Sequence, residues 1–188
     1  MPRLTLALDL EDTLITPLVR ANLYMMHPGP FHPRPGLREF LVWAGERFDL
    51  VVFTGVPEPM AAKVLSRLVE DGHVPEAFGR VAIHLAMDAR GRTRPPKRAG
   101  DLDERLKDLT RLGPVGAVLM LDDNPEGYCV SGQEAFWIKI PEIPRKMGTP
   151  TGDEDLARAR EMIERAAASM EAGETPLVTW GGRGLGGW

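Results

Sequence analysis

The sequence predicts an α/β fold with a central, mostly parallel sheet and helices on both of its faces. Three short apolar runs lie far apart in the chain, and amphipathic helical patterns separate them. Strands of a parallel sheet are buried on both faces, so they read as continuous apolar runs. Alternation of such strands with helices is typical of right-handed βαβ units.

Length and composition narrow the class of protein. The 188 residues are enough for one domain and barely enough for two. The hydrophobic share of 43% and charged share of 27% exclude wholesale disorder, and a net charge of −4 gives no basic surplus for nucleic acid. One cysteine, no N-terminal signal pattern and no apolar run of bilayer length lead us to expect a cytoplasmic protein without membrane contact.

The first predicted strand is the apolar run at residues 4–8 together with Leu10, and acidic residues lie at its end. Asp9, Glu11 and Asp12 lie where this strand should end. Ligands of open α/β sheets bind at the carboxyl ends of the strands, and carboxylate oxygens suit Mg²⁺, which attracts phosphate. Acidic residues after a strand also commonly form turns or cap helices. The residues at the ends of the other predicted strands are therefore needed to distinguish a cation site from a simple turn.

The next elements are a loop, a helix and a second strand. Residues 16–36 are rich in Pro and Gly, which predicts a loop, and the helical spacing of apolar residues predicts a helix over about 35–47. The apolar, β-branched run at 50–53 predicts the second strand. Thr54 and Gly55 follow at once at its carboxyl end.

The middle of the chain contains two predicted helices, two predicted strands and a basic loop. An amphipathic pattern predicts a helix from residue 57 to the glycine at 72, and residues 81–86 alternate as in a strand. A basic loop rich in Arg and Pro covers 90–98. Over 101–112, a capping box and a leucine stripe predict another helix. The third apolar run, at 117–121, predicts a strand.

This third run also ends in acidic residues, Asp122 and Asp123. A further strand is predicted at 136–140 and a long helix at 153–172, where apolar residues recur at helical spacing. The glycine-rich residues 173–188 predict a flexible C-terminal tail. Acidic groups at the first and third strand ends favour the cation site over the simple turn.

The order of these parts resembles the haloacid dehalogenase (HAD) superfamily of phosphotransferases. The closer likeness is to its capless branch, the FCP/SCP-like (NLI-interacting-factor-like) C-terminal-domain phosphatases, and it spans about the first three quarters of the chain. The resemblance implies a Rossmann-like HAD fold in a single domain over 1–172. The motifs that carry it are DLEDTLI at Asp9, RPGLREFL at Arg34, VVFTG at Val51, KDLTRLG at Lys107 and LMLDDNPEGY at Leu119.

The resemblance implies a Mg²⁺-dependent phosphomonoesterase, a hydrolase that acts through an aspartyl-phosphate. Asp9 would be the nucleophile, and Glu11 the general acid and then the general base. Thr54 and Gly55 would bind the phosphoryl group. Where this chain has Glu11 the family normally has Asp, so the reach of the acid grows by one methylene.

The metal ligands implied by the resemblance come from the first and third strand ends. Mg²⁺ would be held by the Asp9 carboxylate, the main-chain carbonyl of Glu11, Asp122 and Asp123. Its charge would let a carboxylate and a phosphate dianion approach each other.

A lysine is also implied, because the charge that gathers in the transition state must be neutralised. Lys107 matches the family motif KDLTRLG, but the predicted helix over 101–112 would hold it in mid-helix. Lys97 precedes that helix on a loop that can return to the edge of the sheet. We therefore expect Lys97 in the site, with Lys107 as the alternative.

The short connection between the first two strands leaves no room for a large cap domain. An uncapped site accepts bulky substrates, so we expect a phosphoprotein or another bulky phosphate ester, with a small molecule as a further option. One alternative is a nucleic-acid 3′-end phosphatase in which the basic loop 90–98 contacts the strand. Another is a catalytically weak module that binds phosphate or a partner protein and is disabled by Glu11.

Overall fold

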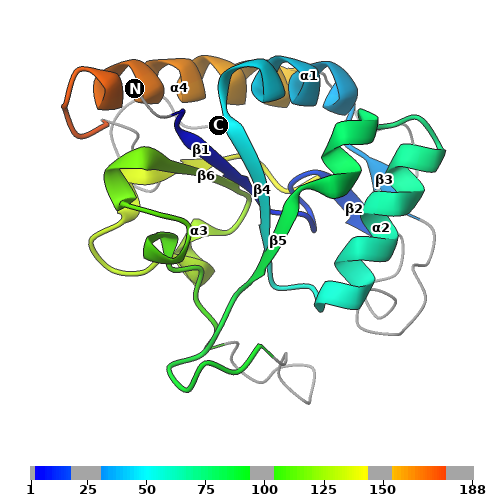
Figure 1. The fold of residues 1–188 in the computed structure, drawn as a ribbon, viewed down its shortest axis with the longest axis horizontal. Helices are drawn as coiled ribbons and strands as arrows, with labels where there is room; N and C mark the ends of the chain where they lie inside the picture. Colours follow the sequence, from blue (N-terminus) through cyan, green and yellow to red (C-terminus); the bar gives the residue numbers. More distant parts are fainter. Residues whose placement is uncertain (1–2, 18–30, 94–103, 144–153, 177–188) are drawn as a thin grey trace.

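The computed structural model describes residues 3–17, 31–93, 104–143 and 154–176. Its centre is a five-stranded sheet in the order β5-β4-β1-β6-β7, and all four strand pairs are parallel (Figure 1). This confirms the predicted α/β class and the parallel sheet, and the described ranges contain no large cap domain. The strands are β1 (Thr5–Leu8), β4 (Asp49–Thr54), β5 (Ala82–Leu85), β6 (Val118–Asp122) and β7 (Trp137–Lys139).

Three long helices correspond to the predictions over 35–47, 57–72 and 153–172. They are α1 (Leu37–Arg47), α2 (Glu58–Glu70) and α4 (Glu154–Glu171). None of the helices in the described ranges is both long and apolar enough to cross a membrane. The shorter helical segments are η2 (Glu76–Arg80), η3 (Leu109–Arg111), η4 (Val115–Ala117), α3 (Pro125–Tyr128) and η5 (Glu134–Phe136).

The two faces of the sheet carry different layers (Figure 1). Alternate residues of a strand point to opposite faces, and Leu6 and Leu8 of β1 pack with the three long helices while Ala7 packs on the other side. That second face is covered by η3, α3, η5 and the chain around them. The core therefore has a long-helix side and a short-segment side.

Right-handed crossovers explain this division. The chain first runs from β1 to β4 and β5, then returns to the far side of β1 for β6 and β7. Because crossovers between parallel strands are right-handed, the reversal of direction moves the connections to the opposite face. The strand order thus reverses between β1 and β6, which is the point where open α/β sheets bind ligands.

The register brings the predicted strand ends together. Leu8 of β1 is paired with Val52 of β4 and with Leu121 of β6. The next residues, Asp9 on β1 and Asp122 on β6, therefore lie side by side at the carboxyl edge of the sheet. Thr54 ends the neighbouring strand at the same edge.

The predicted loop over 16–36 is wrong at both of its ends. Ile15–Pro17 (β2) and Phe31–Pro33 (β3) form an antiparallel pair, so the chain after β1 is a two-stranded ribbon. Its prolines suggested a loop, but an isolated two-stranded ribbon has only edge strands, where proline is tolerated. Residues 18–30 lie outside the described ranges.

The predicted helix over 101–112 is wrong in its described part. Residues 104–108 are extended, and only η3 is helical. Leu106 exchanges two backbone hydrogen bonds with Met87, and the Lys107 N–H donates to the Tyr128 carbonyl. These distant partners replace the hydrogen bonds of a helix. The capping residue of the prediction, Asp101, lies outside the described ranges, as do tail residues 177–188.

Arg34, in the motif RPGLREFL, joins three separate segments. Its buried guanidinium donates to the main-chain carbonyls of Asp12 and Thr13 at 2.9 and 2.7 Å, and to that of Pro141 at 2.6 Å. It also pairs with Asp155 of α4 at 2.9 Å. The turn after β1 is thereby fixed to the chain after β7 and to the last helix.

We expect Arg34→Ala to lower the free energy of unfolding by about 3–5 kcal/mol, because removing one partner of a buried ionic network leaves the other polar groups unsatisfied. Urea unfolding followed by circular dichroism measures this change. Arg67→Ala is the control, since the Arg67 side chain is 59% exposed and pairs with Asp71 at the surface. Equal losses in the two variants would contradict the role of Arg34.

Candidate active site

Asp9 lies directly after β1, at the point where the strand order reverses. Its main-chain N–H donates to the Leu121 carbonyl of β6 at 3.0 Å, which continues the parallel ladder by one residue. Its side chain is almost fully buried, with the residue 6% exposed. The backbone of the sheet itself therefore fixes this carboxylate.

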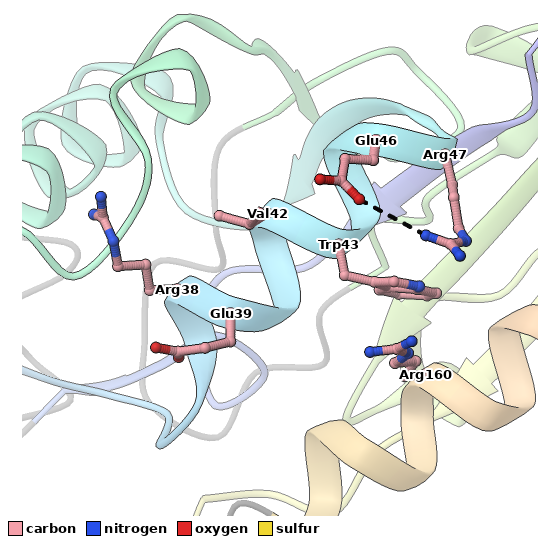
Figure 2. Close-up of a pocket in the computed structure, with 7 residues that line it drawn as sticks. All are labelled: Arg38, Glu39, Val42, Trp43, Glu46, Arg47 and Arg160. Atoms are coloured by element: carbon pink, nitrogen blue, oxygen red, sulfur yellow. Dashed lines mark ion pairs between the residues drawn. The ribbon is translucent and has the colours of Figure 1, made fainter.

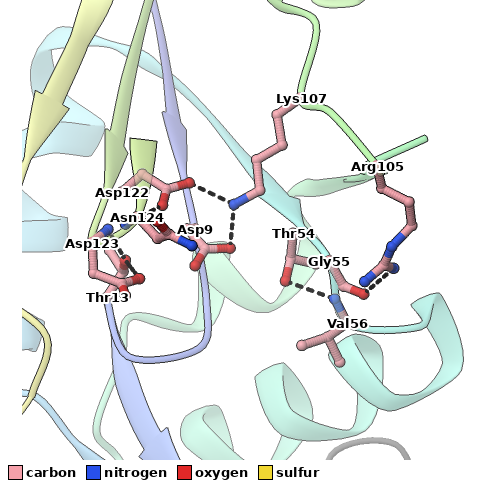
Figure 3. A network of polar contacts seen from close by, with 10 residues as sticks. All are labelled: Asp9, Thr13, Thr54, Gly55, Val56, Arg105, Lys107, Asp122, Asp123 and Asn124. Atoms are coloured by element: carbon pink, nitrogen blue, oxygen red, sulfur yellow. Dashed lines mark hydrogen bonds and ion pairs between the residues drawn. The ribbon is translucent and has the colours of Figure 1, made fainter. Parts of the chain in front are cut away.

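Two further carboxylates come from the end of β6 (Figure 3). Asp122 is fully buried and accepts a hydrogen bond from the Asn124 N–H at 2.8 Å. Asp123 accepts a hydrogen bond from the Thr13 hydroxyl, while its own N–H donates to that hydroxyl, each at 2.9 Å. Carboxylate oxygens of Asp9, Asp122 and Asp123 all lie within 4.8 Å of one another. We call these three residues the carboxylate cluster.

Lys107 places a positive charge against the carboxylate cluster. It is fully buried, and its Nζ lies 2.7 Å from Asp9 Oδ1 and 2.6 Å from Asp122 Oδ2. The ring of Tyr128 lies below the ammonium group, with its centroid 4.7 Å from Nζ. Burial lowers the pKa of Lys107, but Asp122 and Asp9 raise it by more, so the ammonium group stays charged.

The carboxylate cluster holds more negative charge than Lys107 balances. Burial and the neighbouring Asp122 raise the pKa of Asp9 to about 6, although Lys107 opposes the shift. Burial and the charges of Asp9 and Asp122 raise the pKa of Asp123 to about 8. A divalent cation among these oxygens would relieve both shifts, and oxygen-only donors suit a hard cation such as Mg²⁺. The donor set therefore fits the predicted metal.

Thr54 and Gly55 lie at the end of β4, the next strand along the edge. The buried Thr54 hydroxyl accepts a hydrogen bond from the Val56 N–H at 3.1 Å, which shapes a tight turn. The Gly55 carbonyl accepts a hydrogen bond from Arg105 at 2.6 Å. This turn and the carboxylate cluster face the same region of the sheet edge (Figure 3).

Glu11 lies in the turn that directly follows Asp9, where it forms an isolated bridge with Ile15 and is partly buried. The next residue, Asp12, has a left-handed φ of 61°, the only non-glycine residue with positive φ in the described ranges. Its N–H donates to the Ile15 carbonyl and its side chain accepts a hydrogen bond from Thr16. This local closure makes the chain reverse immediately after the predicted nucleophile.

Of the two lysines considered from sequence, the structure places Lys107 against the carboxylate cluster, whereas Lys97 lies outside the described ranges. The choice of Lys97 depended on a helix over 101–112. Because residues 104–108 are extended instead, Lys107 reaches the edge of the sheet.

Sequence reasoning assigned no role to two arginines beside this site, Arg34 and Arg105. Arg34 lies in the motif RPGLREFL, but no local sequence pattern predicts the main-chain carbonyls to which it donates. Arg105 stands two positions before Lys107, a spacing that carries a signal only if the chain is extended there.

A hollow lies on the surface of α1 that faces α4, and none of its lining residues belongs to the carboxylate cluster (Figure 2). Arg47 and Arg160 stack on Trp43, with 5.7 and 5.0 Å between guanidinium carbon and ring centroid. They also pair with the neighbouring Glu46 and Glu164. The lining residues are Arg38, Glu39, Val42, Trp43, Glu46, Arg47 and Arg160.

The fold and the site define an α/β protein with buried carboxylates and a lysine at its switch point, an arrangement suited to phosphoryl chemistry. The family model of NLI interacting factor-like phosphatase matches residues 4–170. The chain belongs to this family of phosphatases, which confirms the resemblance and the enzyme class predicted from the motifs. Among curated proteins, no sequence matches the chain significantly.

Two solved structures are similar in overall fold. One is a variant of the fission yeast RNA polymerase II CTD phosphatase Fcp1 bound to beryllium fluoride, with 18% identity and a TM-score of 0.47 over 94% of this chain and 58% of that one. The other is Fcp1, an essential RNA polymerase II CTD phosphatase, with 22% identity and a TM-score of 0.48 over 92% and 50%. The chain thus spans little more than half of the length of these proteins.

The ionic contacts of Lys107 generate a prediction about pH. In metal-free protein we expect Lys107→Met to lower the free energy of unfolding by about 3–5 kcal/mol at pH 8, because two buried carboxylates lose their cation. Without Lys107 the pKa of Asp9 rises further, so the folded variant takes up a proton at a higher pH than the unfolded chain does. The loss should therefore shrink by about 1–2 kcal/mol at pH 5.

Chemical unfolding at several pH values in the presence of EDTA measures this dependence. Lys139→Met is the matched control, because Lys139 also pairs with a carboxylate, that of Glu126, but is 36% exposed. Its effect should stay below about 1 kcal/mol at every pH. A loss for Lys107→Met that does not change with pH would contradict the ionic explanation.

Proposed function

We propose that this chain is a Mg²⁺-dependent phosphomonoesterase in which Asp9 is the nucleophile. The observation that carries the proposal is the buried Lys107, which lies within hydrogen-bonding distance of Asp9 and Asp122 at the switch point of the sheet. Membership in a phosphatase family supports the same reaction class. A lysine in this position can neutralise charge on a phosphoryl group that approaches Asp9.

The first step transfers the phosphoryl group to the protein. An oxygen of Asp9 attacks phosphorus, and the bond between phosphorus and the ester oxygen breaks as the aspartyl-phosphate forms. Glu11 donates its proton to the departing oxygen, which leaves as an alcohol. The Lys107 ammonium and the turn at Thr54 and Gly55 stabilise the charge on the transferring oxygens.

The second step restores the carboxylate. Glu11, now ionised, takes a proton from a water molecule as that water attacks phosphorus. The bond between phosphorus and the Asp9 oxygen breaks, which releases inorganic phosphate. Glu11 is protonated again and Asp9 is ionised, so atoms and charges return to the starting state.

The residues that would hold Mg²⁺ are Asp9, Asp122 and Asp123, together with the main-chain carbonyl of Glu11. When bound, the ion supplies positive charge that reduces the repulsion between a carboxylate and a phosphate dianion. We propose Lys107 as the lysine of the reaction, in place of Lys97, because of its contacts with Asp9 and Asp122.

The proposed substrate is a bulky phosphate ester, such as a phosphorylated side chain of another protein. The described residues form no large cap domain over the carboxyl edge of the sheet, which supports a site that an extended substrate can approach. We retain the expectation that the protein acts in the cytoplasm, which depends on its single cysteine.

We expect the wild-type chain to hydrolyse p-nitrophenyl phosphate in the presence of Mg²⁺, and EDTA to abolish the reaction until Mg²⁺ is restored. Asp9→Asn should lower kcat at least about 10³-fold, because no nucleophile remains. Release of nitrophenol measures both effects. Asp71→Asn, which changes an exposed ion pair with Arg67, is the control and should keep wild-type activity.

A substrate panel tests the proposed substrate class. Release of phosphate from a phosphoserine peptide is compared with release from a 3′-phosphorylated oligonucleotide, and faster hydrolysis of the peptide is the expected result. Preference for the oligonucleotide would replace the proposed substrate with a nucleic-acid end. Hydrolysis that persists in Asp9→Asn would exclude the proposed nucleophile.

Glu11→Gln should affect the two steps differently. The rate on an alkyl phosphate should fall by about 10²–10⁴-fold, because its leaving oxygen needs a proton. With p-nitrophenyl phosphate the first step should survive, and one equivalent of nitrophenol should appear in a burst before turnover stalls. Rapid-mixing kinetics measures the burst.

Equal losses on both esters, without a burst, would contradict the role of Glu11 as acid and base. If the wild type binds Mg²⁺ and phosphate without turnover and Glu11→Asp gains activity, the chain is instead a binding module disabled at this position.

A further inference from the structure

The segment 104–108, which we call the crossing segment, runs over the carboxyl edge of the sheet. Its backbone is fixed on both sides, because Leu106 is hydrogen-bonded to Met87 and the Lys107 N–H donates to Tyr128. Beyond it, the Gln133 side chain accepts a hydrogen bond from the Leu109 N–H at 2.9 Å. The crossing segment is therefore held by these hydrogen bonds in addition to the ion pairs of Lys107.

An extended backbone sends alternate side chains to the same side. Arg105 and Lys107 accordingly both reach toward the strand ends, while Leu106 between them is 39% exposed (Figure 3). Lys107 contacts the ends of β1 and β6, and Arg105 contacts the turn after β4. Two cations from one short segment thus reach the two halves of the proposed site.

Arg105 lies against the backbone of that turn. The residue is only 2% exposed, and its Nη1 donates to the Gly55 carbonyl at 2.6 Å and to the Thr93 carbonyl at 3.0 Å. A Cβ on Gly55 would lie 3.3 Å from Arg105 Nη2 and equally close to the Tyr128 hydroxyl. Glycine is thus the residue that lets the guanidinium and the phenol approach the turn so closely.

We propose that Arg105 is a positioning residue that holds the turn at Thr54 and Gly55 in the conformation that binds the phosphoryl group. The inference rests on the proposed function and extends it to a residue outside the family motifs quoted above. The guanidinium fixes the Gly55 carbonyl and so determines where the Thr54 hydroxyl and the N–H groups of the turn point. Its positive charge also favours an anion at the turn.

A neutral or differently shaped side chain in place of Arg105 should therefore weaken phosphate binding more than it slows the chemical step. The turn contacts phosphoryl oxygens in both the substrate complex and the transition state, so its disturbance removes binding that the two states share. In Arg105→Met, we expect KM for p-nitrophenyl phosphate and Ki for inorganic phosphate to rise about 10–100-fold, because hydrogen bonds to charged groups are lost. The value of kcat should change by less than about threefold.

Arg105→Lys and Arg111→Met complete the set of variants. Lysine keeps the charge but lacks the planar guanidinium, so its KM and Ki should lie between those of the wild type and Arg105→Met. Arg111 is the matched control: it also donates to a carbonyl at a strand end, that of Leu85 at 2.6 Å, but it is exposed, and its side chain also contacts the ring of Phe53. Its KM, Ki and kcat should equal those of the wild type.

A merely structural role gives a different result. In that case the Arg105 variants would unfold at lower urea concentration while KM and Ki stayed at wild-type values in the folded protein, which overturns the proposal. If Arg105→Met does not fold, Arg105→Lys decides alone: a Ki raised at least about fivefold supports the proposal, and an unchanged Ki overturns it.

A separate measurement distinguishes this inference from the proposed function. Calorimetry of Mg²⁺-loaded protein measures binding of inorganic phosphate without any turnover. A wild type that binds phosphate but hydrolyses no ester refutes the phosphatase, whereas weaker binding by Arg105→Met still supports the positioning role. A wild type that binds no phosphate overturns both.

Discussion

The buried ammonium group of Lys107 is the interaction on which the rest of the site depends. It lies between carboxylates from two different strands, and it belongs to a third segment that is separate from both. Burial of a lone charge is strongly unfavourable, so each partner is tolerated only because the others are present. The ends of β1 and β6 and the crossing segment are thereby held in one arrangement. The same contact that fixes the fold at this edge places a cation beside the proposed nucleophile.

The parts of the fold that depend on local pattern were predictable. Buried parallel strands read as apolar runs, and the long helices α1, α2 and α4 show an apolar stripe, so both kinds of element were visible in the sequence. The chain at 101–112 has a leucine pattern of the same kind, yet in its described part only the short η3 is helical. There the backbone pairs with Met87 and Tyr128, and the Lys107 side chain pairs with Asp9 and Asp122. Tertiary contacts of this strength override a local helical preference.

Residues of the candidate site that directly follow a strand could be predicted from the sequence, whereas residues elsewhere in the chain could not. Asp9, Asp122 and Asp123 could be placed together because parallel strands align their carboxyl ends. The preference for Lys97 over Lys107 depended on the incorrect helix: Lys107 lies against the carboxylate cluster, and Lys97 lies outside the described ranges. Arg34 and Arg105 were missed for a related reason: each acts on main-chain carbonyls that are far away in sequence, and no periodicity reports such contacts.

The two faces of the sheet are covered unequally, so we expect local unfolding to begin on one of them. One face is closed by three long helices, whereas the face that carries the crossing segment is closed by short helical turns with few internal backbone hydrogen bonds. Regions of this second kind open locally at lower free energy than packed helices and strands. We therefore expect sub-global opening on that side to separate Lys107 and Arg105 from the strand ends while the sheet and its layer of long helices persist. The contacts between Lys107 and the carboxylate cluster should then be lost on heating before most of the secondary structure.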